Sequence, residues 1–69
     1  MSSKHDDTVL RILSVDTIKS TNEILKELEL EAKVKINWHA LYRILTELAE
    51  KNHAEKLQSK AGFFWRKKE

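Results

Sequence analysis

The sequence predicts a small α+β fold in which three helices are followed by a C-terminal β-hairpin. Apolar residues recur at helical spacing in three segments, the last of which ends near Asn52. Beyond Asn52 the spacing changes to the alternation typical of strands, and Gly62, the only glycine, lies between two alternating runs. A chain of 69 residues holds one domain at most, and the absence of proline leaves no linker signal. Because it has no cysteine, disulfides cannot stabilise it, so its stability must come from apolar packing.

The first helix is expected over residues 6–19, after residues 1–5, which we expect to lack structure. Asp6 or Asp7 can cap its N-terminus. Its apolar stripe is expected to comprise Val9, Leu10, Ile12, Leu13 and Ile18. This apolar side, which also includes Val15, is larger than one small core needs, so a homodimer through helix 1 is a hypothesis.

The second helix is expected over residues 21–31. Ser20 is a hydroxyl N-cap with Glu23 close behind it, which is the pattern of a capping box. Its apolar positions are Ile24, Leu25, Leu28 and Leu30. Acidic residues lie along one side of this helix, which is either a solvated face or a surface for a protein partner; they are Glu23, Glu27 and Glu31.

The third helix is expected over residues 37–52, after a connector that contains Lys33 and Lys35. Asn37 can cap its N-terminus, and Asn52 stands where a left-handed C-cap is expected. The apolar residues Leu41, Ile44, Leu45 and Leu48 follow the spacing i, i+3, i+4, i+7. This spacing predicts one buried face.

The hairpin is expected over residues 54–67, with strands 55–59 and 63–67 joined by a three-residue turn. Gly62 would supply the positive φ of that turn. In this register Leu57 faces Trp65, and Lys56 faces Arg66. Directly opposed like charges destabilise a two-stranded ribbon, so a Lys56–Arg66 pair would need a reason outside the hairpin to exist. By alternation Phe63 and Trp65 close the core, whereas Phe64 is on the other face.

The distribution of charge is more informative than the net charge of +2. The first 50 residues contain seven Lys/Arg and nine Asp/Glu, whereas residues 51–69 contain six Lys/Arg and two Asp/Glu. A concentrated positive patch attracts polyanions whatever the total charge, although a solvated surface has the same composition. The basic part of the chain is therefore the hairpin region.

The order helix, helix, connector, helix, hairpin resembles the winged helix-turn-helix DNA-binding domain family. The segment 41–53, Leu-Tyr-Arg-Ile-Leu-Thr-Glu-Leu-Ala-Glu-Lys-Asn-His, looks like the recognition helix of that family, and the similarity extends from about Thr21 to Lys67. Two features depart from the family pattern: Asn52-His53 replaces Gly and an aliphatic residue, and the wing tip is short, with Lys60 as its one basic residue. No subfamily is identified.

The resemblance implies binding of double-stranded DNA, with helix 3 in the major groove and the wing beside it. Contacts to bases or phosphates are then expected from the exposed residues of helix 3, namely His39, Tyr42, Arg43 and Thr46. Backbone phosphate contacts are expected from Lys33, Lys35, Lys56, Lys60, Arg66 and Lys67. Two alternatives stay open: Arg43 can pair with Glu47 four residues later, and Tyr42 can pack against the apolar stripe.

Other function classes find little support in the sequence. The spacings of His5, His39 and His53 match no zinc motif, so we expect no bound metal. The chain has no phosphate-binding loop or nucleophile motif, so we expect no cofactor and no enzymatic activity. No apolar run suits a membrane span or signal peptide, so an intracellular location in cytoplasm, nucleoid or nucleus is expected.

The predicted function is a transcriptional regulator or chromosome-associated factor. The alternative is a protein interaction module of a replication or transcription assembly, since winged helices serve both roles. Binding of single-stranded nucleic acid through Trp38 and Phe64 is a third hypothesis.

Overall fold

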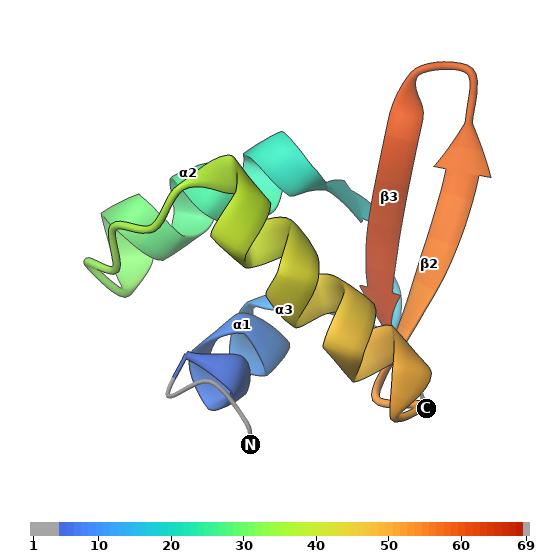
Figure 1. Ribbon diagram of the computed structural model, residues 1–69, viewed down its shortest axis with the longest axis horizontal. Coiled ribbons are helices and arrows are strands. Elements are labelled where there is room, and N and C mark those ends of the chain that lie inside the picture. Colours follow the sequence, from blue (N-terminus) through green and yellow to red (C-terminus); the bar gives the residue numbers. More distant parts are fainter. Residues whose placement is uncertain (1–4, 69) are drawn as a thin grey trace.

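The computed structural model describes residues 5–68 as an α+β architecture of three helices and a three-stranded antiparallel sheet. The helices are α1 (Asp6–Ile12), α2 (Thr21–Glu31) and α3 (Trp38–Glu50); the strands are β1 (Lys19–Ser20), β2 (Ala54–Ser59) and β3 (Gly62–Lys67). The helices lie on one side of the sheet, and the β2–β3 turn extends past them (Figure 1). Within the described part of the chain, no helix has the length and apolar character needed to cross a membrane.

The first helix is shorter than predicted, because α1 ends at Ile12 instead of running to residue 19. Leu13 has an extended backbone, with φ −67° and ψ 150°. Farther on, Lys19 and Ser20 pair with β3 as the short strand β1, which the sequence did not predict. Ile18, expected in the helical stripe, therefore lies outside the helix and is 48% exposed.

The start of α1 also differs from the prediction. His5, not Asp6 or Asp7, is the N-cap residue, and no side chain caps this end of the helix. The His5 carbonyl accepts a hydrogen bond from the Val9 N–H at 2.9 Å. Both aspartates lie in the first turn instead, where negative charge is favourable to the helix dipole. Residues 1–4, the rest of the segment expected to lack structure, lie outside the described residues.

The second helix has the predicted bounds, and its capping box is formed. The Ser20 hydroxyl accepts from the Glu23 N–H at 3.1 Å, and the Glu23 carboxylate accepts from the Ser20 N–H at 3.4 Å. These two bonds satisfy backbone donors that the first turn leaves without helical partners. Ile24 and Leu28 are buried as expected, whereas Leu30 is 68% exposed.

The third helix is capped at both ends by the asparagines that the sequence indicated. The Asn37 side chain accepts from the Ala40 N–H at 2.7 Å. At the other end Asn52 has φ +65°, its N–H bonds to the Ala49 carbonyl at 3.1 Å, and the His53 N–H bonds to the Leu48 carbonyl at 2.8 Å. This pair of bonds is a Schellman motif. Asn52 takes the left-handed position that glycine most often occupies at helix ends.

The hairpin register differs from the predicted one by one residue. Ser59 pairs with Gly62, so only Lys60 and Ala61 form the turn. Gly62 has the expected positive φ, +126°, but adopts it as the first residue of β3. In consequence the two predicted cross-strand pairs are wrong. The observed pairs are Leu57 with Phe64, Lys56 with Trp65 and Glu55 with Arg66.

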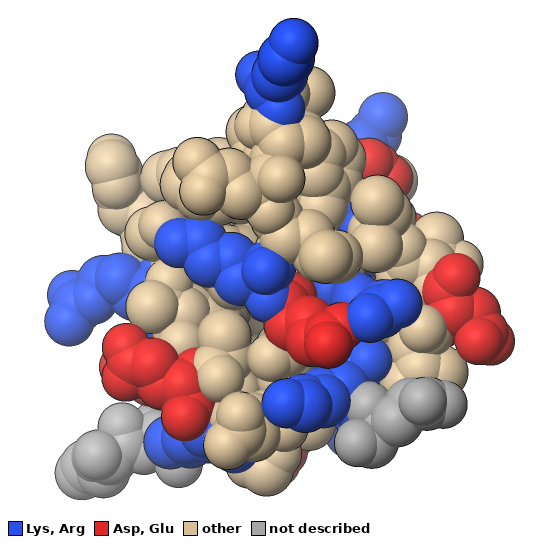
Figure 2. Space-filling model, turned by 90° about the vertical axis from the view of Figure 1, so that its right-hand side faces the viewer, with Lys and Arg blue, Asp and Glu red and all other residues tan. Residues whose placement is uncertain are grey.

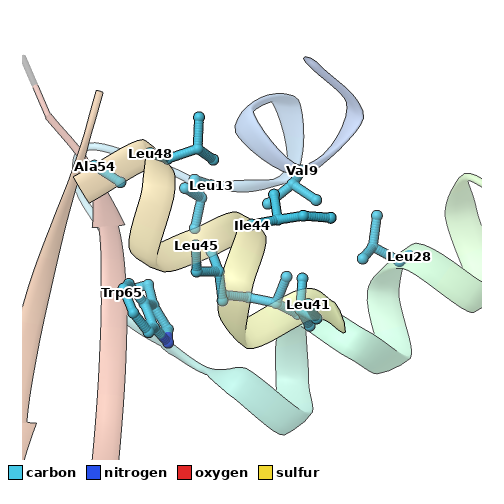
Figure 3. Close-up of a cluster of buried hydrophobic side chains, with 10 residues drawn as sticks. Val9, Leu13, Leu28, Leu41, Ile44, Leu45, Leu48, Ala54 and Trp65 are labelled. Carbon is cyan, nitrogen blue, oxygen red and sulfur yellow. The ribbon is translucent and has the colours of Figure 1, made fainter. Parts of the chain in front are cut away.

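All three helices and the hairpin contribute to one core (Figure 3). The buried apolar residues are Val9, Leu13, Ile24, Leu28, Leu41, Ile44, Leu45, Leu48, Ala54 and Trp65. Trp65 has no exposed surface, and its indole Nε1–H donates to the Thr21 hydroxyl at 2.8 Å. This bond satisfies the one polar group of the largest core residue and links β3 to the start of α2.

Replacing Thr21 by valine is expected to destabilise the fold, because the shape is nearly kept while the buried indole N–H loses its acceptor. The free energy of unfolding should fall by about 1–3 kcal/mol, measured by urea denaturation. Thr17→Val, at an exposed threonine, is the matched control and should change it by less than about 0.5 kcal/mol. Equal stability of the two variants would contradict a structural role for this bond.

Candidate nucleic-acid interface

The outward face of α3 is basic in its N-terminal half. Because Leu41, Ile44 and Leu45 point into the core, the helical period turns His39 and Arg43 to solvent. The first turn of α3 contains no acidic residue. A polyanion that approaches this end of the helix therefore meets the charge of Arg43 and the positive end of the helix dipole, although Asn37 already caps the Ala40 N–H.

Arg43 is exposed and has no partner among the described residues. The ion pairs within residues 5–68 join Lys19 to Glu27 and Arg66 to Glu55, so Arg43 does not form the alternative pair with Glu47. The guanidinium is exposed and makes no hydrogen bond within the described chain. Of the predicted contact residues on α3, Arg43 has the geometry that best suits a bidentate contact to a base or phosphate.

The C-terminal half of the same face has the opposite charge. A shallow depression of about 260 Å³ runs along α3 and is lined by Tyr42, Arg43, Thr46, Glu47 and Glu50. The two glutamates at its far end repel phosphate. Contact with nucleic acid is therefore favoured over the first two turns of α3 and disfavoured over the last two.

Tyr42 connects α3 to the hairpin instead of pointing into solvent. Its ring stacks on Trp38 with centroids 5.2 Å apart and an interplanar angle of 8°. Its ring centroid also lies 5.7 Å from that of Phe63 and 5.8 Å from that of Trp65, with the second pair in a T-shaped arrangement. Of the two expectations for Tyr42, packing is the one that these contacts match. The residue positions α3 relative to the hairpin.

Lys56 completes this aromatic cluster. Its ammonium lies 4.3 Å from the ring centroid of Phe63 and 5.3 Å from that of Tyr42, and it donates to the Tyr42 hydroxyl at 3.0 Å. Cation–π attraction of this kind contributes roughly 0.5–1 kcal/mol at an exposed site. Lys56 thus holds the hairpin against α3, while its exposed side chain keeps positive charge beside the helix.

Thr46 uses its hydroxyl within the helix. The Thr46 Oγ1–H donates to the Tyr42 carbonyl at 2.8 Å, one turn earlier. This bond occupies the one hydroxyl donor, so a base contact from Thr46 would be limited to its methyl group or to an accepted hydrogen bond.

The basic residues of the hairpin do not form one patch. Arg66 binds Glu55 on the neighbouring strand through Nε at 2.9 Å and through Nη2. Strand alternation puts this pair on the sheet face opposite Trp65, and so away from the helices. The predicted like-charge pair of Lys56 and Arg66 does not exist, so the external reason that it would have required is not needed.

The remaining basic candidates are spread over three places. Lys60 is exposed in the hairpin turn, at the tip of the molecule. Lys67 lies at the opposite end of β3, where its N–H bonds to the Ser14 carbonyl. Lys33 and Lys35 are exposed in the connector before α3. Figure 2, which faces the hairpin side, shows basic and acidic side chains interspersed over its middle and lower part, mostly uncharged surface above them, and a basic side chain at the top.

The chemistry available at this surface is recognition by charge, hydrogen bonds and aromatic rings. Among residues 5–68, no three His, Cys, Asp or Glu side chains are grouped so that they could hold a metal ion. No family model, curated protein or solved structure matches this chain.

Sequence reasoning did not anticipate the aromatic cluster as a unit. It assigned Trp38, Tyr42 and Phe63 to separate roles. The available signal was the i, i+4 spacing of Trp38 and Tyr42, which places two rings on the same helix face. Their contact with Lys56 depends on the hairpin register, which the spacing does not reveal.

Lys56→Met is expected to lower the free energy of unfolding by about 1 kcal/mol, because methionine keeps the apolar stem but removes the ammonium and its hydrogen bond. Thermal or urea denaturation measures the change. Lys60→Met removes the same charge from the turn and should leave stability within about 0.5 kcal/mol of the parent. If both substitutions have the same effect, Lys56 does not hold the hairpin.

Proposed function

We propose that this chain binds double-stranded DNA as a winged helix-turn-helix domain, with α3 in the major groove and the β2–β3 hairpin beside it. The observation that carries the proposal is Arg43, which is exposed on the outward face of α3 and pairs with none of the described residues. A helix of this diameter fits the major groove, where arginine can bind guanine O6 and N7 together.

The contacts of the proposed complex divide by role. Arg43 and His39 are the candidates for base edges. Lys33 and Lys35 precede the helix and are suited to phosphates on one side of the groove, and Lys60 can reach phosphates from the hairpin turn. Tyr42 and Lys56 support this surface by setting the position of the hairpin relative to α3, whereas the Thr46 hydroxyl is bonded within the helix.

Two of the predicted phosphate contacts receive less support. Arg66 is engaged with Glu55 on the sheet face away from the helices, so DNA contact would require it to leave that partner. Lys67 lies at the base of the hairpin, far along β3 from the turn. The hairpin contribution is therefore proposed to come from Lys56 and Lys60.

The biological role proposed for such a domain is transcription regulation or chromosome association, without catalysis. This role would place the protein in the compartment that holds the DNA. Homodimerisation through α1 remains a proposal that the packing does not favour. Val9 and Leu13 are buried within this chain, and Leu10 and Ile12 pack against the same core.

A second candidate function, docking of another protein, is favoured by one observation. The sheet face away from the helices presents Leu57 paired with Phe64, and Ile18, which precedes β1, is 48% exposed. The acidic side of α2, the other surface suggested for a partner, is partly used within the chain. Glu27 pairs with Lys19 at 2.9 Å, and Glu23 belongs to the capping box.

Fluorescence anisotropy with a labelled random-sequence duplex, from low to moderate salt, tests the DNA proposal. The parent should bind with a strong salt dependence, because cationic side chains displace condensed counterions. Arg43→Ala should lower the affinity about 3- to 10-fold and reduce the salt slope by about one counterion.

The matched control is Lys51→Ala, which removes one positive charge from the other end of the same helix and should have little effect. Glu47→Gln should bind somewhat more tightly than the parent, since a repulsive charge is lost. Absence of binding at low salt would overturn the proposal and direct attention to the sheet face that carries Phe64.

A further inference from the structure

Trp38 is an exposed aromatic residue, so burial in the core does not explain why a tryptophan stands at this position. It is the first residue of α3, and its side chain remains 37% exposed, whereas Trp65 is completely buried. A large apolar ring left in solvent at the end of a proposed recognition helix is a candidate contact residue.

The ring of Trp38 is held in a fixed orientation. Tyr42 stacks nearly parallel to it at 5.2 Å, and His39 meets it edge to face at 5.6 Å and 89°. Tyr42 is in turn fixed by Phe63, by Trp65 and by the hydrogen bond from Lys56. The exposed indole is therefore the outer member of a series of rings anchored in the core, and a ligand would not have to order it.

The charges around Trp38 suit a nucleic acid. Lys35 is exposed three residues before it, and His39 and Arg43 are exposed on the following turns of α3. The acidic residues of the helix, Glu47 and Glu50, lie at its far end. A phosphate backbone that passes this end of α3 can be bound by Lys35 and Arg43, with the imidazole of His39 as a hydrogen-bond partner, while a base lies against the indole.

We propose that Trp38 stacks on an unpaired nucleobase, so that the preferred ligand is a DNA duplex carrying a single-stranded overhang. Every base has an aromatic face, and stacking on a tryptophan is tolerant of sequence. A base within a duplex would first have to be unstacked and unpaired, whereas a base in an overhang is already available. The inference rests on the proposed DNA-binding function and names the kind of DNA end that it would favour.

Three ligands of matched sequence test the proposal by anisotropy: a blunt duplex, the same duplex with a three-nucleotide overhang, and one whose overhang has abasic sugars. The abasic overhang keeps the added phosphates and lacks the bases. The normal overhang should bind at least about fivefold more tightly than the other two. Trp38→Leu should abolish this preference, and Trp38→Phe, which keeps an aromatic face, should retain most of it.

Intrinsic fluorescence supplies a second readout. Since Trp65 is shielded in the core, quenching by the overhang should come from Trp38 and should be absent in Trp38→Phe. Urea denaturation of Trp38→Leu separates a loss of stability from a loss of stacking, and binding is measured only where the variant is folded.

The outcomes distinguish this inference from the function on which it rests. Blunt-duplex binding without any gain from the normal overhang overturns the stacking role and leaves the DNA-binding function in place. A gain from the abasic overhang equal to that from the normal one also overturns it, because phosphates alone would explain the effect. Binding of the overhang duplex through Trp38, without binding of the blunt duplex, would support stacking and overturn the duplex-binding function.

Discussion

Trp65 occupies the point at which the sheet meets α2 and α3, and the arrangement of the whole chain depends on how this side chain is accommodated. It lies in the middle strand, with Lys19 of β1 on one side and Lys56 of β2 on the other. Its indole N–H is satisfied by Thr21 and its ring edge meets Tyr42. One residue thus joins the three strands to both helices, and burying a ring of this size is a large apolar contribution for a core this small.

The parts of the fold that could be predicted are those determined by neighbours in sequence. The helix ends are specified by hydrogen bonds between residues only a few positions apart. The residues that specify them are Ser20 and Glu23 at the start of α2, and Asn37 and Asn52 at the ends of α3. Residues 13–20 could not be predicted in this way. Their apolar spacing is compatible with a helix, but pairing of Lys19 and Ser20 with β3, a contact distant in sequence, determines their conformation.

The candidate site shows the same division. The helical period correctly indicated that His39 and Arg43 face solvent, whereas Tyr42 and Thr46, also expected to be exposed, are half-buried. For the hairpin, a shift of one residue in the register moves every side chain to a different partner. Whether Gly62 belongs to the turn or to β3 decides if Arg66 opposes Lys56 or Glu55, and alternation in sequence does not determine this. The resemblance to a winged helix rested on the order of the elements and on the segment 41–53, so the loss of the predicted Lys56–Arg66 pair does not change it.

The sheet order β1-β3-β2 makes β2 an outer strand, so one edge of its backbone has no strand partner among the described residues. Such an edge is a template for association between molecules, and proteins commonly guard it with charged side chains. The charged residues of β2 are Glu55 and Lys56. They also form the hydrogen bonds to Arg66 and Tyr42. Resistance to aggregation and the placement of the hairpin against α3 are thus assigned to the same two residues, and selection for either property constrains the other.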